Sequence, residues 1–91
     1  MESRAPSAVS AALADEIRAE MARQRCTRRD VAAALEATPH TTERRLSGDV
    51  PFDVVQLARI GQLLGVDPAT FLRRADERAL SHGDTSTQPA A

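Results

Sequence analysis

Arginine side chains are concentrated in the middle of this 91-residue sequence. All 12 basic residues are arginines, and seven of them lie within residues 18–45, where four acidic residues occur. This segment therefore carries a local charge of +3, although the net charge of the chain is −1. Arginine donates to phosphate oxygens and to guanine through a planar fork of N–H groups. The distribution is typical of a nucleic-acid-binding surface, and on charge alone a solvated arginine-rich face is an equally good interpretation.

Side chains suited to catalysis or metal binding are scarce. The chain has two histidines and one cysteine, and it lacks a glycine-rich phosphate loop. His40 has no partner at a metal-ligand spacing, so we interpret it as a surface residue. Cys26 cannot form an internal disulfide, and we expect it to be a small buried hydrophobic residue. We therefore expect no enzymatic activity, no cofactor and no metal ion.

The composition predicts a single all-α domain. Apolar residues make up 42% of the chain, alanine dominates them, and no strand-length alternation of apolar and polar residues occurs. No apolar run approaches the roughly 20 residues of a membrane span. Asp15 and Glu16 interrupt the first apolar segment, so it does not read as a signal peptide. The sequence predicts a compact five-helix domain over residues 7–80 of a cytoplasmic protein that does not contact membranes.

The first two helices follow from apolar spacing and end signals. A flexible tail is predicted over residues 1–6, and a helix from Ser7 to about Arg25. Its apolar stripe consists of Val9, Leu13, Ile17 and Met21. Thr27 is a candidate N-cap for a short second helix, with Asp30 favoured in its first turn. The inner face of this second helix consists of Val31, Ala32 and Leu35.

The last three helices have clear start and stop residues. Thr38-Pro39 starts the third helix, which is predicted to reach about Ser47 and to end at Gly48. Asp53 and Gln56 resemble a capping box that opens the fourth helix, ending at Gly65. The residues expected to be buried on the fourth helix are Val54, Leu57, Ile60 and Leu64. Asp67-Pro68 starts a fifth helix that is predicted to close at His82-Gly83. Its expected inner side consists of Phe71, Leu72, Ala75 and Ala79. Residues 81–91 are predicted to be a disordered tail.

The second and third helices together have the pattern of a helix-turn-helix over about residues 27–47. Two short helices are joined by about three residues, and the small side chain of Ala32 allows them to pack closely. The outer, N-terminal side of the third helix carries side chains that can hydrogen-bond. These are His40, Thr41, Glu43 and Arg44.

From Thr27 to Leu72 the sequence resembles the lambdoid phage repressor and Cro family, also called the Xre family. The resemblance is carried by Arg44-Arg-Leu-Ser-Gly48, Pro51, Leu57-Ala-Arg-Ile60 and Leu63-Leu-Gly-Val66. It implies a lambda-repressor-like DNA-binding fold with a helix-turn-helix.

Three residues depart from the pattern of that family. Glu36 occupies the usual glycine position of the turn, where a positive φ costs a non-glycine residue roughly 1 kcal/mol. Thr42 and Arg45 occupy positions that are usually apolar. They leave open whether Arg44 or Arg45 faces DNA. Arg45 could also lie along the inner face, or pair with Glu43 or with Asp49.

The resemblance implies roles for nine residues. Phosphate contacts are implied for Arg28, Arg29, Thr38 and Arg45, although Arg28 and Arg29 could also be solvated helix-start residues. Base contacts are implied for Pro39, His40, Thr41, Glu43 and Arg44. Among these, Arg44 suits guanine, Glu43 suits cytosine, and Pro39 offers only an apolar contact.

The function implied by the resemblance is that of a small Cro-like or immunity-type transcriptional repressor that occupies an operator through its third helix. We expect double-stranded DNA with an inverted repeat as the partner, a homodimer at least on DNA, and no small-molecule ligand. The fourth and fifth helices are expected to form the dimer surface, with Phe71, Leu72 and Leu80 as candidates. The alternative is a protein-interaction module on the same fold, either an antitoxin or a phage protein that binds a host factor. In that case residues 73–91 are expected to be needed, whereas a repressor could dispense with them.

Overall fold

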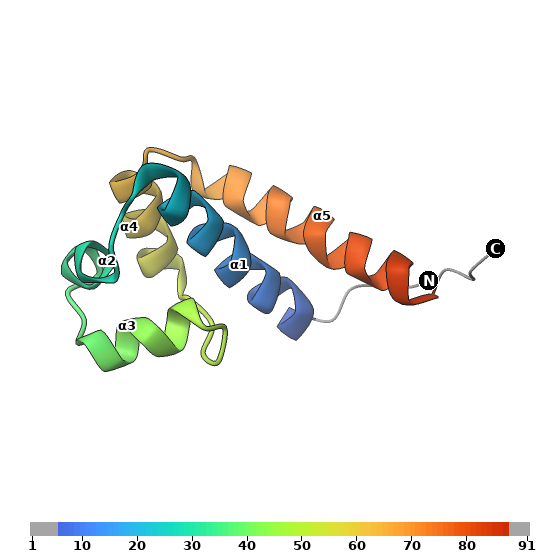
Figure 1. Cartoon of the computed structure of the whole chain (residues 1–91), viewed down its shortest axis with the longest axis horizontal. Coiled ribbons are helices and arrows are strands. Elements are labelled where there is room, and N and C mark those ends of the chain that lie inside the picture. The colour runs from blue at the N-terminus through green and yellow to red at the C-terminus, as the bar shows by residue number, and fades with distance from the viewer. Residues whose placement is uncertain (1–5, 88–91) are drawn as a thin grey trace.

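The computed structural model describes residues 6–87, with side chains as far as Ser81. These residues form five helices and no strand: α1 (Pro6–Gln24), α2 (Arg28–Leu35), α3 (Pro39–Leu46), α4 (Val54–Leu64) and α5 (Pro68–Thr87) (Figure 1). The predicted all-α fold with five helices is confirmed. Residues 1–5 and 88–91, which belong to the predicted tails, lie outside the described residues. None of the described helices is long and apolar enough to cross a membrane.

The two long helices pack along one another, while the three short ones gather at one end of the pair (Figure 1). The predicted stripe of α1 points into the core, since Leu13, Ile17 and Met21 are buried. Val9 packs against the core while partly exposed. The other helices contribute fully buried side chains, among them Val31, Leu46, Ile60 and Phe71.

The predicted helix ends are confirmed at several positions. Thr27, Thr38 and Asp53 are N-caps, and the side chain of each accepts a hydrogen bond from the backbone N–H three residues later. Gly48 and Gly65 have positive φ angles of 91° and 68°, as expected of glycines that end helices. The bounds of α2 and α3 therefore follow from local sequence signals.

Two predicted core residues and one predicted helix end are wrong. Val54 is 83% exposed, because it lies in the first turn of α4 and Phe52 from the preceding loop packs against the core instead. Leu72 is 45% exposed. It lies one residue, or about 100° of helix rotation, from Phe71 on the buried side. The fifth helix does not end at His82-Gly83 but continues to Thr87, since a glycine inside a helix is tolerated at a cost of about 1 kcal/mol.

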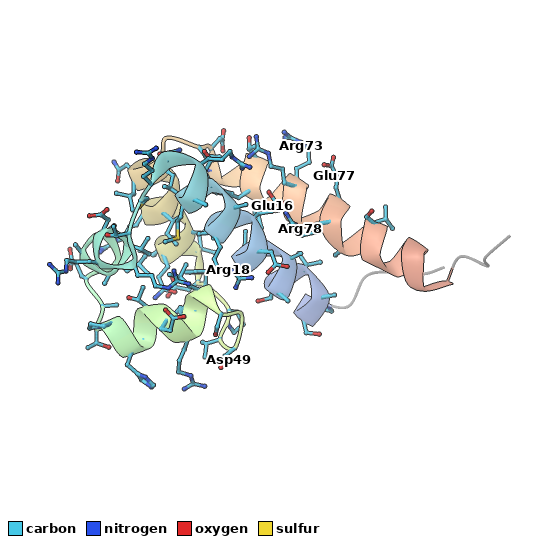
Figure 2. The ribbon with its side chains drawn as sticks, in the orientation of Figure 1. Glu16, Arg18, Asp49, Arg73, Glu77 and Arg78 are labelled. Carbon is cyan, nitrogen blue, oxygen red and sulfur yellow. The ribbon has the colours of Figure 1, made fainter. Side chains whose placement is uncertain are left out.

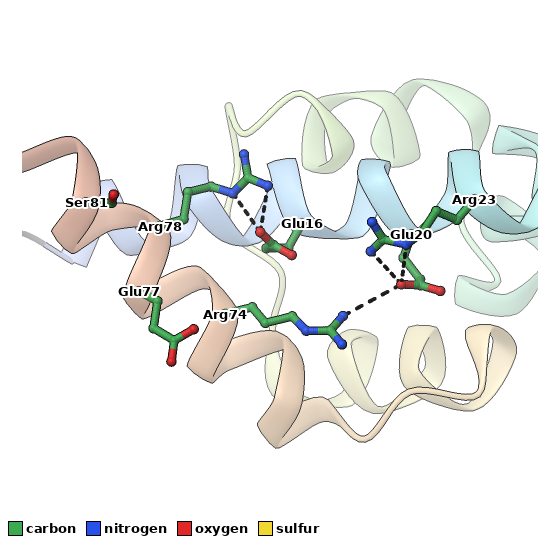
Figure 3. A pocket seen from close by; sticks show the side chains of 7 residues that line it. All are labelled: Glu16, Glu20, Arg23, Arg74, Glu77, Arg78 and Ser81. Carbon is green, nitrogen blue, oxygen red and sulfur yellow. Dashed lines mark hydrogen bonds and ion pairs between the residues drawn. The ribbon is translucent and has the colours of Figure 1, made fainter. Parts of the chain in front are cut away.

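Ion pairs join α5 to α1 beside the apolar contact (Figure 3). Glu16 is 9% exposed, and its carboxylate accepts hydrogen bonds from Arg78, with an Nη2–Oε2 distance of 2.6 Å. Glu20 lies 2.7 Å from Arg23 and 3.7 Å from Arg74. The arginines of this surface are therefore matched to carboxylates from the same two helices.

Candidate functional site

The start of α2 is fixed by a capping box. The N–H of Asp30 donates to Thr27 Oγ1 over 3.1 Å, and the N–H of Thr27 donates to Asp30 Oδ2 over 3.0 Å. The hydrogen bonds from the Thr27 backbone and hydroxyl hold the pKa of Asp30 below its usual value. Arg28 and Arg29 follow as the first two residues of α2, and both are exposed. Their side chains therefore extend into solvent from a helix N-terminus that the capping box fixes.

The turn between α2 and α3 passes through a left-handed residue. Glu36 has φ 55° and ψ 43°, the conformation for which glycine is usual. The N–H of Ala37 donates to the carbonyl of Ala32 over 3.1 Å and closes the end of α2. The carboxylate of Glu36 lies 3.3 Å from the guanidinium of Arg59 on α4. The turn thus has a conformation that its sequence does not favour. It is held by the hydrogen bond to the end of α2 and by the ion pair to α4.

The inner face of α3 is anchored in the core. Thr42 is 1% exposed and Leu46 is fully buried, so Thr42 does occupy an inward position. Its hydroxyl oxygen is buried and has no hydrogen-bond partner in the described part of the chain. Arg18 of α1 donates to the Leu46 carbonyl over 2.5 Å, and Figure 2 labels Arg18 where α1 meets the end of α3. This contact joins residues 28 positions apart, so no local sequence pattern predicts it.

The outer face of α3 presents His40 and Arg44, which are exposed and lie one helical turn apart. Neither side chain makes a hydrogen bond or ion pair with a residue that the structure describes. Thr41 is half-buried, and its hydroxyl accepts a hydrogen bond from the Thr38 hydroxyl over 3.1 Å. Thr38 also caps α3 by accepting from the N–H of Thr41. His40 and Arg44 are therefore the side chains of α3 that remain available to another molecule.

Arg45 has a different environment from Arg44. Its Nη1 donates to the carbonyl of Pro51, and its Nε is buried without a hydrogen-bond partner in the region described. Arg45 is only half-exposed and lies against the loop after α3. Glu43, one of its two possible partners, pairs elsewhere. Arg44, not Arg45, is thus the more accessible of the two arginines.

Glu43 forms an ion pair with Arg28 that links α3 to α2. The Nε–Oε1 distance is 2.7 Å, and the two side chains are 53% and 57% exposed respectively. The sequence predicts separate roles for the two residues and does not predict their pairing, because no periodicity relates residues 15 positions apart on different helices. The pair lies at the rim of a hollow between the two helices.

The structure brings the nine predicted site residues together around two adjoining hollows. The first is lined by Arg28, Arg29, Pro39, His40 and Glu43, together with two residues of the α2–α3 contact. The second is lined by His40, Thr41, Arg44, Arg45 and Val50. His40 is shared by the two, and Thr38 is hydrogen-bonded to Thr41 at the edge of the second. The predicted site residues of α2 and α3 therefore share one stretch of surface.

Other chemistry has little support among the described residues. No group of three or more histidine, cysteine, aspartate or glutamate residues there is arranged to hold a metal ion. Cys26 is half-buried against the core, and burial raises the pKa of its thiol, followed by a smaller effect of the Asp30 charge. Cys26 thus packs at the edge of the core and is less buried than the sequence predicts.

The described residues form a small all-α domain with five helices, and the second and third of these carry the predicted site residues around two adjoining hollows. Residues 8–90 match the BetR domain, so the chain belongs to the BetR domain family. No curated protein and no solved structure matches the chain.

Proposed function

We propose that this BetR-domain protein binds double-stranded DNA in a sequence-specific manner, as a small transcriptional repressor that occupies its operator. We infer that α2 and α3 form a helix-turn-helix of the lambda-repressor-like type. The observation that carries the proposal is the division of α3 into two faces. Thr42 and Leu46 anchor one face in the core, and the opposite face presents His40 and Arg44 with no partner among the described residues. A rigid helix with free donors on its outer side suits the major groove.

The charge at the start of α2 supports a phosphate contact beside that groove. Arg28 and Arg29 are exposed at the N-terminus of α2, where backbone N–H groups and the helix dipole favour an anion. In the proposed complex these side chains set the position of the protein on the DNA backbone. Arg44 reads guanine through two hydrogen bonds, and His40 contacts a neighbouring base.

A short recognition helix argues for a two-fold dimer on DNA. With eight residues, α3 presents few base-reading side chains, so one domain discriminates poorly against a genome of competing sites. Two copies on an inverted repeat, with half-sites about 10 base pairs apart, double these contacts. Leu72 and Leu80 are 45% and 47% exposed on α5 and suit the contact between copies. Phe71 is fully buried in its own core, so it is removed from the predicted dimer surface.

The test is selection of a binding site from random duplexes, followed by mass photometry on the selected site. We expect an inverted repeat that binds two copies of the protein, with an affinity that falls steeply as the salt concentration rises. One copy on a site without inverted symmetry would contradict the dimer. The absence of salt-dependent binding to any duplex would contradict the proposed function.

The second candidate function, a protein-interaction module, is favoured by two exposed valines. Val54 and Val55, at the start of α4, are 83% and 59% exposed, which suits contact with another protein. Deletion of residues 73–91 does not separate the two functions cleanly, because Ala75 and Ala79 are part of the core. The variant Val54→Ser with Val55→Ser is a better test. A repressor that uses α3 keeps its duplex affinity in this variant.

A further inference from the structure

The ion pair between α2 and α3 uses one edge of the Arg28 guanidinium. Arg28 Nε donates to Glu43 Oε1 over 2.7 Å, and no hydrogen bond joins Nη1 or Nη2 to any residue that the structure describes. A guanidinium is planar and has five N–H donors in a fixed arrangement. Holding Nε therefore limits the orientation of the whole group and leaves its terminal amino groups for another acceptor.

We propose that Glu43 is a positioning residue, which orients Arg28 so that Nη1 and Nη2 bind one phosphodiester group of the DNA backbone. This inference rests on the proposed function and deepens it. The two side chains line the same hollow between α2 and α3, together with Arg29 and His40. Arg28 is also the first residue of α2, and a helix N-terminus favours an anion. Two parallel N–H···O bonds to a phosphate are the geometry that arginine provides and lysine does not.

The same geometry assigns Glu43 a role that differs from base reading. One oxygen of its carboxylate is already bonded to Arg28, which offsets its charge near the phosphates. Both side chains are more than half exposed, so their ion pair contributes little to folding. An effect of Glu43 on DNA binding is therefore expected to pass through Arg28.

The decisive comparison is between Glu43→Gln and Glu43→Ala in the full chain. Both variants lose the negative charge, and Gln alone keeps an oxygen that can accept from Arg28 Nε. We expect Glu43→Gln to bind every duplex about two- to tenfold more tightly than Glu43→Ala, because the arginine is already ordered before DNA binds. The difference disappears when both variants are made in an Arg28→Ala background. Glu77→Gln and Glu77→Ala, at an exposed position of α5, are the matched controls and are expected to bind duplexes equally (Figure 2).

A measurement without DNA tests the contact itself. In the free protein, the Arg28 Nε–H resonance is expected to exchange slowly with water in the wild type and in Glu43→Gln, and rapidly in Glu43→Ala. Equal exchange in all three proteins overturns the positioning role.

The duplex measurements can overturn the inference in two further ways. Equal affinities of Glu43→Gln and Glu43→Ala mean that Glu43 acts only through its charge. A difference that is confined to one base pair and persists in the Arg28→Ala background means that Glu43 reads a base. If the wild type binds no duplex, the proposed function fails and this inference fails with it. Failure of the proposed function can be told apart from failure of the positioning role, because it is seen with the wild type and needs no variant.

Discussion

Two arginine-bearing surfaces of this molecule differ in how their charges are used. Where α5 packs on α1, the guanidiniums of Arg23, Arg74 and Arg78 lie within 4 Å of the carboxylates of Glu16 or Glu20 (Figure 3). On α2 and α3, Arg29 and Arg44 are exposed and have no carboxylate within that distance among the described residues. Arginines therefore join two helices through ion pairs on the first surface, and they remain available to a ligand on the second.

This difference shows that the number of arginines is a poor guide to a binding surface. Glu16 is buried and Glu20 is half-buried, and the arginines of α5 offset carboxylate charges that are costly to remove from water. On α3, the exposed Arg44 has no such carboxylate among the described residues, so its charge is available to attract a polyanion. The partners of each arginine, and not the number of arginines alone, must therefore be considered when a binding surface is proposed.

The largest expected effect belongs to Arg44. Arg44→Ala is expected to weaken binding to the selected operator by about 1–3 kcal/mol and to relax one base preference, because a bidentate contact to guanine is lost. Binding assays on the operator and on its single-base variants measure both effects. Arg73→Ala removes the same charge from an exposed position of α5 and is the matched control (Figure 2).

The two arginine-bearing surfaces do not differ in their contribution to binding if Arg44→Ala and Arg73→Ala have the same effect. Equal losses of affinity in Arg44→Ala and Arg73→Ala would mean that only net charge matters. A loss of base preference in Arg45→Ala instead would mean that Arg45 leaves the Pro51 carbonyl when DNA binds.

The second effect concerns the stability of the paired surface. Arg78→Ala leaves the nearly buried carboxylate of Glu16 without its partner, so we expect the free energy of unfolding to fall by about 1–2 kcal/mol. Chemical denaturation measures this change, and Arg73→Ala is expected to stay within about 0.5 kcal/mol of the wild type. Duplex affinity of the folded Arg78→Ala protein should not change. A loss of affinity there would show that the α1–α5 surface takes part in binding.

A smaller effect is expected from acid. The hydrogen bond from Arg23, then that from Gln24, holds the pKa of Glu20 below its usual 4.5. A lowered pKa contributes stability above the unfolded value, and this contribution is lost as the pH falls below 4.5 and through the folded value. Glu20→Gln is expected to have a melting temperature that falls less than that of the wild type across this range. Asp30 keeps its own lowered pKa in both proteins and so cancels in the comparison. Parallel pH profiles of the two proteins would contradict the role of Glu20.

Local signals in the sequence were enough for much of the fold. The caps at Thr27, Thr38 and Asp53 and the glycine at position 65 act over a few residues, so their spacing predicts where helices begin and end. Val54 shows where such reasoning stops. Whether an apolar residue in a first helical turn is covered depends on which neighbours reach it, and those neighbours come from elsewhere in the chain.

In the candidate site, too, local sequence patterns predict some features and not others. Helical periodicity placed His40 and Arg44 on one face of α3, and the structure has them there, both exposed. The partners of Arg28 and Arg45 could not be predicted, because they come from α3 and from the loop after it. Long charged side chains choose among several acceptors within reach, and that choice requires the tertiary structure.

Two left-handed residues without a glycine offer the smallest and sharpest comparison. Arg25, at the end of α1, and Glu36, at the end of α2, have φ angles of 57° and 55°. Glycine at either position removes roughly 1 kcal/mol of backbone strain, while the greater freedom of the unfolded chain offsets part of that gain. Arg25 forms no ion pair with the residues described, whereas Glu36 pairs with Arg59 over 3.3 Å.

Arg25→Gly is therefore expected to stabilise the protein by up to about 1 kcal/mol, and Glu36→Gly by less. The difference between them measures the Glu36–Arg59 ion pair, which at these exposures contributes about 0–1 kcal/mol. Repeating both variants in an Arg59→Ala background should make the two gains equal, as judged by denaturation midpoints. A clear destabilisation by Glu36→Gly that persists without Arg59 would mean that the unfolded-chain entropy outweighs the strain. The strain at this turn would then be too small to explain why glycine is usual there.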